Sequence, residues 1–104
     1  MDVMQGDAYS VTFAIASEDG EVTAEQVVDV EIIIGDMRKT YAAGEVSYDA
    51  ENRCFVFPLS QEETLHLPNA PLTCQVRCKF MSGDVIGTDL GKIDVKRSAS
   101  KVVL

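Results

Sequence analysis

The sequence predicts an all-β domain of the two-sheet sandwich type. We expect about 7–8 antiparallel strands and one short helical crossover near residues 60–67. Three observations predict this fold: a period-two alternation of apolar and polar residues, turn-forming residues about every 8–12 positions, and a helix signal confined to one segment. Residues 1–104 are expected to form a single domain, because a chain of 104 residues suits one hydrophobic core.

The first half of the chain reads as strands separated by turns. The first strand is expected from Tyr9 to Ile15, and Glu18-Asp19-Gly20 is a typical turn after it. A second strand is expected from Val27 to Ile34 and ends at Gly35-Asp36, and a weaker strand runs from Met37 to Tyr41. The side chains expected to face the core are Tyr9, Val11, Phe13, Ile15, Val28, Val30, Ile32 and Ile34.

A hairpin and a short helix follow in the middle of the chain. The hairpin is predicted from Val46-Ser47-Tyr48, across the polar loop Asp49–Asn52, to Arg53–Phe57. Pro58 lacks a backbone donor, so its strand is expected to end there or to lie at a sheet edge. Ser60-Gln61-Glu62-Glu63 matches a capping box, which predicts one or two helical turns that cross from one sheet to the other.

The last third contains the clearest strand pattern. In Leu72–Phe80, alternate residues are apolar and are expected to face the core. Ser82-Gly83-Asp84 predicts a turn, after which Val85 to Thr88 is expected to pair with the preceding strand. Leu90 to Val95 is expected to continue this strand beyond a bulge. The apolar end Val102-Val103-Leu104 is expected either to complete the domain's own sheet or to lie against another molecule.

The charge is negative and unevenly distributed. The net charge is −8, which argues against nucleic-acid binding because phosphates are bound by clustered Lys and Arg. Residues 1–69 carry fourteen acidic and three basic side chains, whereas residues 70–104 carry three and six. This uneven distribution has two interpretations. The charges are either scattered over the solvated surface, or they form acidic and basic faces through which neighbouring copies meet in an assembly.

The sequence predicts neither membrane insertion nor secretion. The longest apolar run, Ile32-Ile33-Ile34, is far shorter than the roughly 20 residues of a membrane helix. The N-terminus lacks the basic start and apolar stretch of a signal peptide. Cys54, Cys74 and Cys78 are expected to be buried thiols. Cys74 and Cys78 would lie about 13 Å apart along one strand, too far for a disulfide, whereas pairing of Cys54 with either remains open.

No motif predicts catalysis or cofactor binding, so we expect no catalytic residues, no cofactor-binding residues and no metal site. His66 is the only histidine and lacks the partners of a zinc site or an activated cysteine. The five-residue spacing of Asp84, Asp89 and Asp94 does not match a calcium loop. The glycines Gly83, Gly87 and Gly91 do not precede a helix, as a phosphate loop requires. The chain is therefore predicted not to be an enzyme.

A set of short motifs resembles small prophage-encoded structural proteins. They are Phe13, Glu18-Asp19-Gly20, Gly44–Asp49, Phe57–Thr64, Val76-Arg77 and Gly83-Asp84-Val85. Across roughly residues 8–96 the chain is similar to the immunoglobulin-like domains of phage virions, especially the N-terminal domain of baseplate upper proteins. The resemblance implies an immunoglobulin-like β-sandwich, although the chain lacks the Trp of antibody domains. It also lacks the long further regions of baseplate upper proteins, so the expectation is a stand-alone component.

The resemblance implies a non-enzymatic structural protein of a tail, baseplate, neck or capsid. Its expected partners are other virion proteins or copies of itself, and its expected location is the virion, or the bacterial host cytoplasm before assembly. The alternative is an acidic inhibitor that mimics nucleic acid and blocks a host or defence protein. The candidate acidic residues for that role are Glu18, Asp19, Glu21, Glu25 and Glu45. A sugar-binding role would need a stacking platform from Tyr9, Tyr41 and Tyr48.

Overall fold

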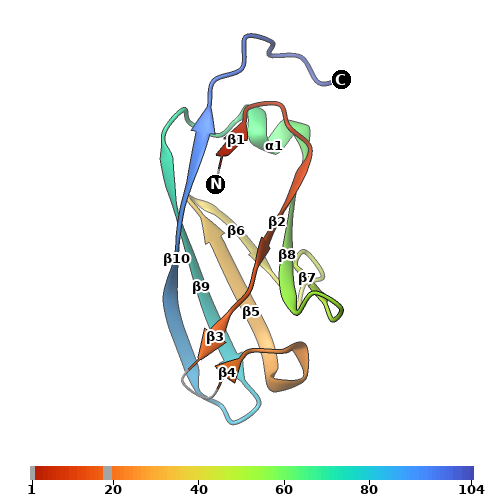
Figure 1. The fold of residues 1–104 in the computed structure, drawn as a ribbon, viewed down its shortest axis with the longest axis vertical. Helices are drawn as coiled ribbons and strands as arrows, with labels where there is room; N and C mark the ends of the chain where they lie inside the picture. The colour runs from red at the N-terminus through yellow and green to blue at the C-terminus, as the bar shows by residue number, and fades with distance from the viewer. Residues whose placement is uncertain (1, 18–19) are drawn as a thin grey trace.

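The computed structural model describes residues 2–17 and 20–104, and these residues are mainly β (Figure 1). A single-turn 3-10 helix at Ala24–Gln26 and the short helix α1 at Gln61–Leu65 are the helical elements of this part of the chain. The strands are β1 (Asp2–Met4), β2 (Tyr9–Phe13), β3 (Ala16–Ser17), β4 (Gly20–Glu21), β5 (Val27–Ile34), β6 (Met37–Thr40), β7 (Ser47–Asp49), β8 (Cys54–Leu59), β9 (Pro71–Phe80) and β10 (Val85–Lys96). The prediction of an all-β fold is confirmed.

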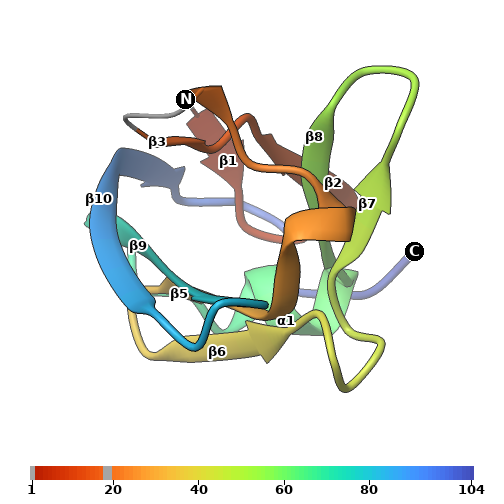
Figure 2. The ribbon, with the colours of Figure 1, turned by 90° about the horizontal axis from the view of Figure 1, so that it is seen from below.

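The strands form a curled five-stranded sheet and a three-stranded sheet. The larger sheet has the order β1-β10-β9-β5-β6, and the smaller has the order β2-β8-β7. Figure 2 shows the larger sheet curving around one side of the molecule, with β2 and β8 opposite. The short strands β3 and β4 form a separate two-stranded sheet. The sequence did not predict β1, β3 or β4, and β1 pairs with β10 in parallel rather than antiparallel.

The hydrophobic core lies between the two sheets. The smaller sheet contributes Val11, Phe55 and Phe57, each fully buried. The rings of Tyr41 and Tyr48 pack against Phe55 with centroid separations of 5.9 and 4.9 Å. The larger sheet contributes alternate residues of its long strands, as the period of two requires: Val30, Ile32, Ile34, Leu72, Cys74, Val76, Cys78, Ile93 and Val95. For β9 the predicted inward face is confirmed, with Phe80 only partly buried.

Two predicted inward positions are wrong. Val28 is 47% exposed, and its neighbour Val27 is buried instead. The register with β9 shifts between Val27 and Asp29, so a bulge reverses the side on which residue 28 projects. Tyr9 is 43% exposed at the start of β2, while Ile15 is buried although it lies beyond the end of that strand.

The turn predicted at Glu18-Asp19-Gly20 falls partly outside the described residues, because residues 18 and 19 are not among them. On either side of this point β3 and β4 are antiparallel, with Ala16 paired to Glu21.

The predicted crossover is confirmed as a connection between the two sheets. Helix α1 follows β8 of the smaller sheet and precedes β9 of the larger one. The Ser60 hydroxyl accepts a hydrogen bond from the Glu63 N–H at 3.1 Å, and the Glu63 carboxylate accepts from the Ser60 N–H at 2.9 Å. Pro58 pairs with Ser10 of β2, while β7 reaches only to Val56 of β8, so Pro58 lies at a local edge.

The C-terminal segment after β10 forms no strand, which contradicts the expectation that it completes the domain's own sheet. Val102, Val103 and Leu104 are exposed, and Figure 1 shows this segment leading away from the sheets. The Gln5 side chain holds the start of this C-terminal segment. The Gln5 amide oxygen accepts a hydrogen bond from the Ser98 N–H at 3.3 Å and another from Lys101 Nζ at 2.7 Å.

Candidate interaction surface

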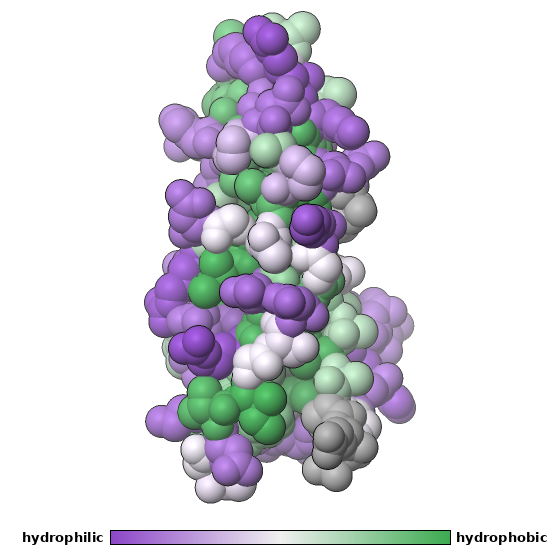
Figure 3. Space-filling view, turned by 90° about the vertical axis from the view of Figure 1, so that its left-hand side faces the viewer, coloured by the Kyte–Doolittle hydropathy of each residue, from purple (hydrophilic) through white to green (hydrophobic). Residues whose placement is uncertain are grey.

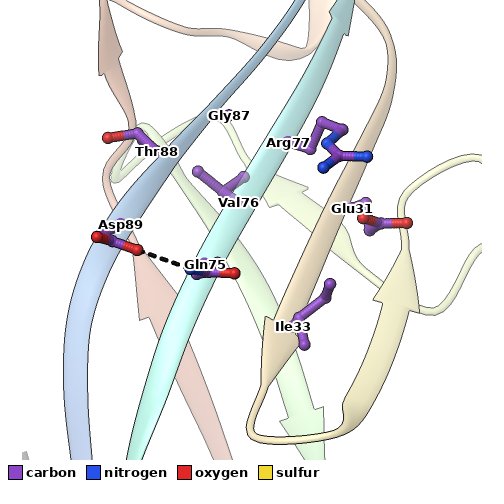
Figure 4. Close-up of a pocket in the computed structure, with 8 residues that line it drawn as sticks. All are labelled: Glu31, Ile33, Gln75, Val76, Arg77, Gly87, Thr88 and Asp89. Atoms are coloured by element: carbon purple, nitrogen blue, oxygen red, sulfur yellow. Dashed lines mark hydrogen bonds between the residues drawn. The ribbon is translucent and has the colours of Figure 1, made fainter.

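A shallow hollow of about 320 Å³ lies on the outer face of the five-stranded sheet, across β5, β9 and β10 (Figure 4). Its side chains alternate along β5 and β9 with buried core residues, so they project away from the core. In the register of the sheet, Gly87 of β10 lies opposite Arg77 of β9. The hollow forms here because Gly87 has no side chain to cover the strand. The outward-facing lining side chains are Glu31, Ile33, Gln75, Arg77 and Asp89.

The polar groups of this hollow are only partly paired. Gln75 donates to the Asp89 carboxylate at 2.9 Å, and Glu31 forms an ion pair with Arg38 of the neighbouring strand β6. No described carboxylate lies within salt-bridge distance of the Arg77 guanidinium. The hollow therefore offers a free guanidinium and amide and carboxylate oxygens, which suit hydrogen bonding to another molecule.

The edge of β10 next to this hollow is open. β1 pairs with β10 from Asp94 to Lys96, so among the described strands Val85 to Asp89 have a neighbour on the β9 side alone. Every residue of that run is exposed. Ile86 and Thr88 pair with Cys78 and Val76, and therefore project on the core-facing side of the sheet, yet no part of the smaller sheet covers them.

Exposed apolar side chains gather at the same end of the sheet. Val28, Met81, Val85 and Ile86 are between 47% and 66% exposed. They lie where β5 begins, β9 ends and β10 begins, because Val27 pairs with Phe80 and Val85 with Lys79. Figure 3 shows apolar surface near this end of the molecule. Grouped apolar surface of this kind is a feature of contact sites.

The cysteines are buried, as predicted. Cys54, Cys74 and Cys78 are 8%, 1% and 3% exposed, and all three are free thiols, so the open question of a Cys54 disulfide is answered against pairing in this structure. Burial raises the pKa of the Cys74 and Cys78 thiols. A raised pKa and poor access make a thiol unreactive, which is the opposite of a catalytic cysteine.

His66 is the one histidine of the sequence, and it lies next to helix α1. It caps the C-terminal end of α1, where its Nδ1 is 2.6 Å from the Glu62 carbonyl oxygen. It also borders a hollow of about 230 Å³ whose other lining residues include Glu63 and Leu67 but no cysteine. Within residues 2–17 and 20–104, no three His, Cys, Asp or Glu side chains are grouped so that they could hold a metal ion.

The acidic residues proposed to mimic nucleic acid are partly used within the domain. Glu21 lies 3.5 Å from Arg53, and the Glu45 carboxylate accepts a hydrogen bond from the Thr40 N–H. Glu25 borders a surface hollow with Glu21. Glu18 and Asp19 are outside the described residues, so the alignment of all five is not tested.

The tyrosines do not form one platform. Tyr41 and Tyr48 are half-buried against Phe55, whereas Tyr9 of β2 pairs with Leu59 of β8.

Sequence reasoning identified the β10 strand but missed its open edge. The signal available in the sequence was the run Val85–Asp89 itself, which has β-branched residues and a glycine but no Lys, Arg or Pro. The open edge depends on where β1 pairs, and the sequence pattern did not predict β1.

In comparisons with known proteins, no family model, curated protein or solved structure matches the chain. In the part of the chain that the structure describes, no helix is long and apolar enough to cross a bilayer.

Proposed function

We propose that the chain is an immunoglobulin-like β-sandwich that acts, without catalysis, as a structural component of a phage or prophage virion. The proposed location within the particle is the tail, baseplate, neck or capsid surface. The proposed mode of action is protein–protein contact through the exposed edge and apolar end of the five-stranded sheet, with other virion proteins or copies of itself as partners.

The strand order supports the immunoglobulin-like part of the proposal. In such domains strands G, F, C and C′ form one sheet and strands B, E and D belong to the other. The order β10-β9-β5-β6 matches the first set, and β2-β8-β7 matches the second. The helix α1 then takes the place of the connection between strands E and F. The chain departs from antibody domains in its core, because β2 contains no cysteine and its fully buried residue is Val11.

One observation supports the contact function best: an open strand edge lies beside solvent-exposed apolar side chains at one end of the molecule. Isolated exposed apolar residues are ordinary, but Val85 and Ile86 are consecutive and project on opposite faces of the same unpaired edge. A partner that covered this edge would remove both side chains from water and satisfy the free backbone groups.

Particle purification from a bacterium that carries the gene tests the proposal. A tagged copy would be expressed in an induced culture, and virions would be separated on a density gradient. We expect the chain to co-sediment with particles at a constant ratio to capsid protein, while a cytoplasmic host protein serves as the negative control. Neighbouring genes for tail, portal or capsid proteins would add independent support.

The same experiment distinguishes the alternative, an acidic inhibitor of a nucleic-acid-binding protein. That function is supported by the net charge of −11 of residues 1–69. Absence from the particles, together with salt-sensitive capture of a nucleic-acid-binding protein from the soluble fraction, would contradict the virion proposal and favour the inhibitor.

A further inference from the structure

The backbone groups at the open edge of β10 have a defined direction. The Phe80 N–H donates to the Asp84 carbonyl oxygen at 2.8 Å, so Asp84 bonds toward β9. Hydrogen-bonded and non-hydrogen-bonded pairs alternate along an antiparallel ladder. Ile86 and Thr88 therefore also bond toward β9, and the N–H and C=O groups of Val85, Gly87 and Asp89 point away from it. No described strand pairs with these three residues on that side.

This edge lacks the features that usually prevent pairing between molecules. Exposed edges are commonly protected by Lys, by Pro or by inward-pointing charges. The opposite edge of the same sheet, β6, carries Arg38 and Lys39. The run Val85–Asp89 has a single charge, and the Asp89 carboxylate already accepts a hydrogen bond from Gln75. The first half of β10 is therefore able to accept another strand.

We propose that the occupant of this edge is β10 of a second copy, paired antiparallel about a two-fold axis at Gly87. This inference deepens the proposed function by naming the partner and the surface. In this register Gly87 faces Gly87 of the second copy, and Val85 faces Asp89. The pairing forms about six backbone hydrogen bonds, because Val85, Gly87 and Asp89 each exchange two with their counterparts.

The side chains in this register are compatible. Ile86 lies opposite Thr88 of the second copy, a pair of β-branched residues that packs well across strands. Gly87 has no side chain, so nothing projects from either strand at the two-fold axis. No two charges of the same sign lie directly opposite, because Asp89 faces Val85. The partnered run ends at Leu90, where β10 bulges away from its regular register.

The local charge also favours this edge. The chain carries a net charge of −8, which opposes self-association over most of its surface. Residues 70–104, which include both β9 and β10, carry a net charge of +3. Near the open run Val85–Asp89, the basic residues Arg77 and Lys79 balance the acidic residues Asp84 and Asp89. Like-charge repulsion is therefore weaker at β10 than on the acidic remainder of the molecule.

A register-specific disulfide tests the inference. Paired residues in a hydrogen-bonded antiparallel pair have Cα atoms about 5.5 Å apart, within the range of a disulfide. A Gly87→Cys variant should therefore form a covalent dimer under mild oxidation. A Val85→Cys variant is the matched control, because its two copies would lie about 13 Å apart, too far to bridge. A Cβ at residue 87 meets nothing closer than 3.6 Å, so the variant is expected to fold.

The unmodified protein gives a second readout. Light scattering should show a dimer, and hydrogen exchange at the amides of Val85, Gly87 and Asp89 should slow as protein concentration rises. Ile86→Lys should abolish the dimer, whereas Met4→Lys, at a similarly exposed apolar position on β1 beyond the open edge, should not. A strict monomer at high concentration, or equal cross-linking of the Gly87→Cys and Val85→Cys variants, would overturn the two-fold pairing. Neither outcome bears on co-sedimentation with particles, so the two proposals fail separately.

Discussion

Thr64 connects the N-terminal part of the chain to helix α1, and its replacement gives a quantitative test of that connection. Thr64 is fully buried. Its hydroxyl donates to the Asp7 carbonyl oxygen at 2.7 Å and accepts from the Gly6 N–H at 2.9 Å. Gly6 and Asp7 lie between β1 and β2, so one side chain holds this connection against the helix. Thr64→Val keeps the shape but removes both hydrogen bonds.

The expected loss of stability follows from the groups left without partners. Leaving buried or part-buried polar groups unsatisfied costs about 1–3 kcal/mol, and we expect about 2 kcal/mol for Thr64→Val. Thr64→Ser keeps the hydroxyl and removes one buried methyl group, which costs about 1 kcal/mol. For a domain of this size, 1 kcal/mol corresponds to roughly 5 °C in Tm. The valine variant should therefore melt about 10 °C below the wild type and the serine variant about 5 °C below.

Urea and thermal unfolding, followed by circular dichroism at one fixed protein concentration, measure both variants. The diagnostic result is the order of the two substitutions, because simple loss of apolar volume predicts that serine is the more damaging. If Thr64→Val proved as stable as the wild type, or more stable than Thr64→Ser, the hydroxyl would not hold the β1–β2 connection and the reasoning would be refuted.

Three further predictions concern a carboxylate, the thiols and a glycine. Burial tends to raise the pKa of Glu63, but the Ser60 N–H and the Lys39 ammonium together hold it below its ordinary value. A carboxylate whose pKa is lower in the folded state stabilises the fold at neutral pH. That stabilisation is lost as the pH falls through the folded-state pKa. Glu63→Gln should therefore cost less than about 1 kcal/mol at pH 7, a cost that vanishes in acid; a pH-independent difference in urea unfolding would refute this. The three thiols should react slowly with a thiol reagent in the native protein and completely in denaturant, and fast native labelling would contradict their burial. Gly91 has φ +103°, so Gly91→Ala should cost about 1–2 kcal/mol in thermal unfolding, whereas Gly87→Ala, on the same strand without a positive φ, should not; equal costs would exclude backbone strain as the cause.

The parts of the fold that sequence predicts well are those in which one physical signal acts alone. Strand β9 alternates without interruption, and its inward residues from Leu72 to Cys78 are buried. The capping box at Ser60 is likewise a local device, and both of its hydrogen bonds form. Such elements require no information from distant parts of the chain.

The errors arise where distant pairing decides the outcome. Val28 belongs to an apolar run that alternation alone places inward, but a bulge opposite β9 turns it outward. Asp2–Met4 is too short to show a period, and it is a strand only because it pairs with β10. The sequence patterns alone gave no reason to choose parallel pairing there.

The position of β1 determines where a contact surface can exist on this domain. β1 covers the end of β10 at Asp94–Lys96, and the bulge beyond Asp89 separates that covered part from the open one. The Gln5 side chain draws the C-terminal segment toward β1 and away from the open edge. The proposed recognition groups are therefore backbone N–H and C=O groups of Val85, Gly87 and Asp89, which any sequence could provide. A search for catalytic or binding motifs does not detect a site of this kind, because topology creates it by leaving one strand half paired.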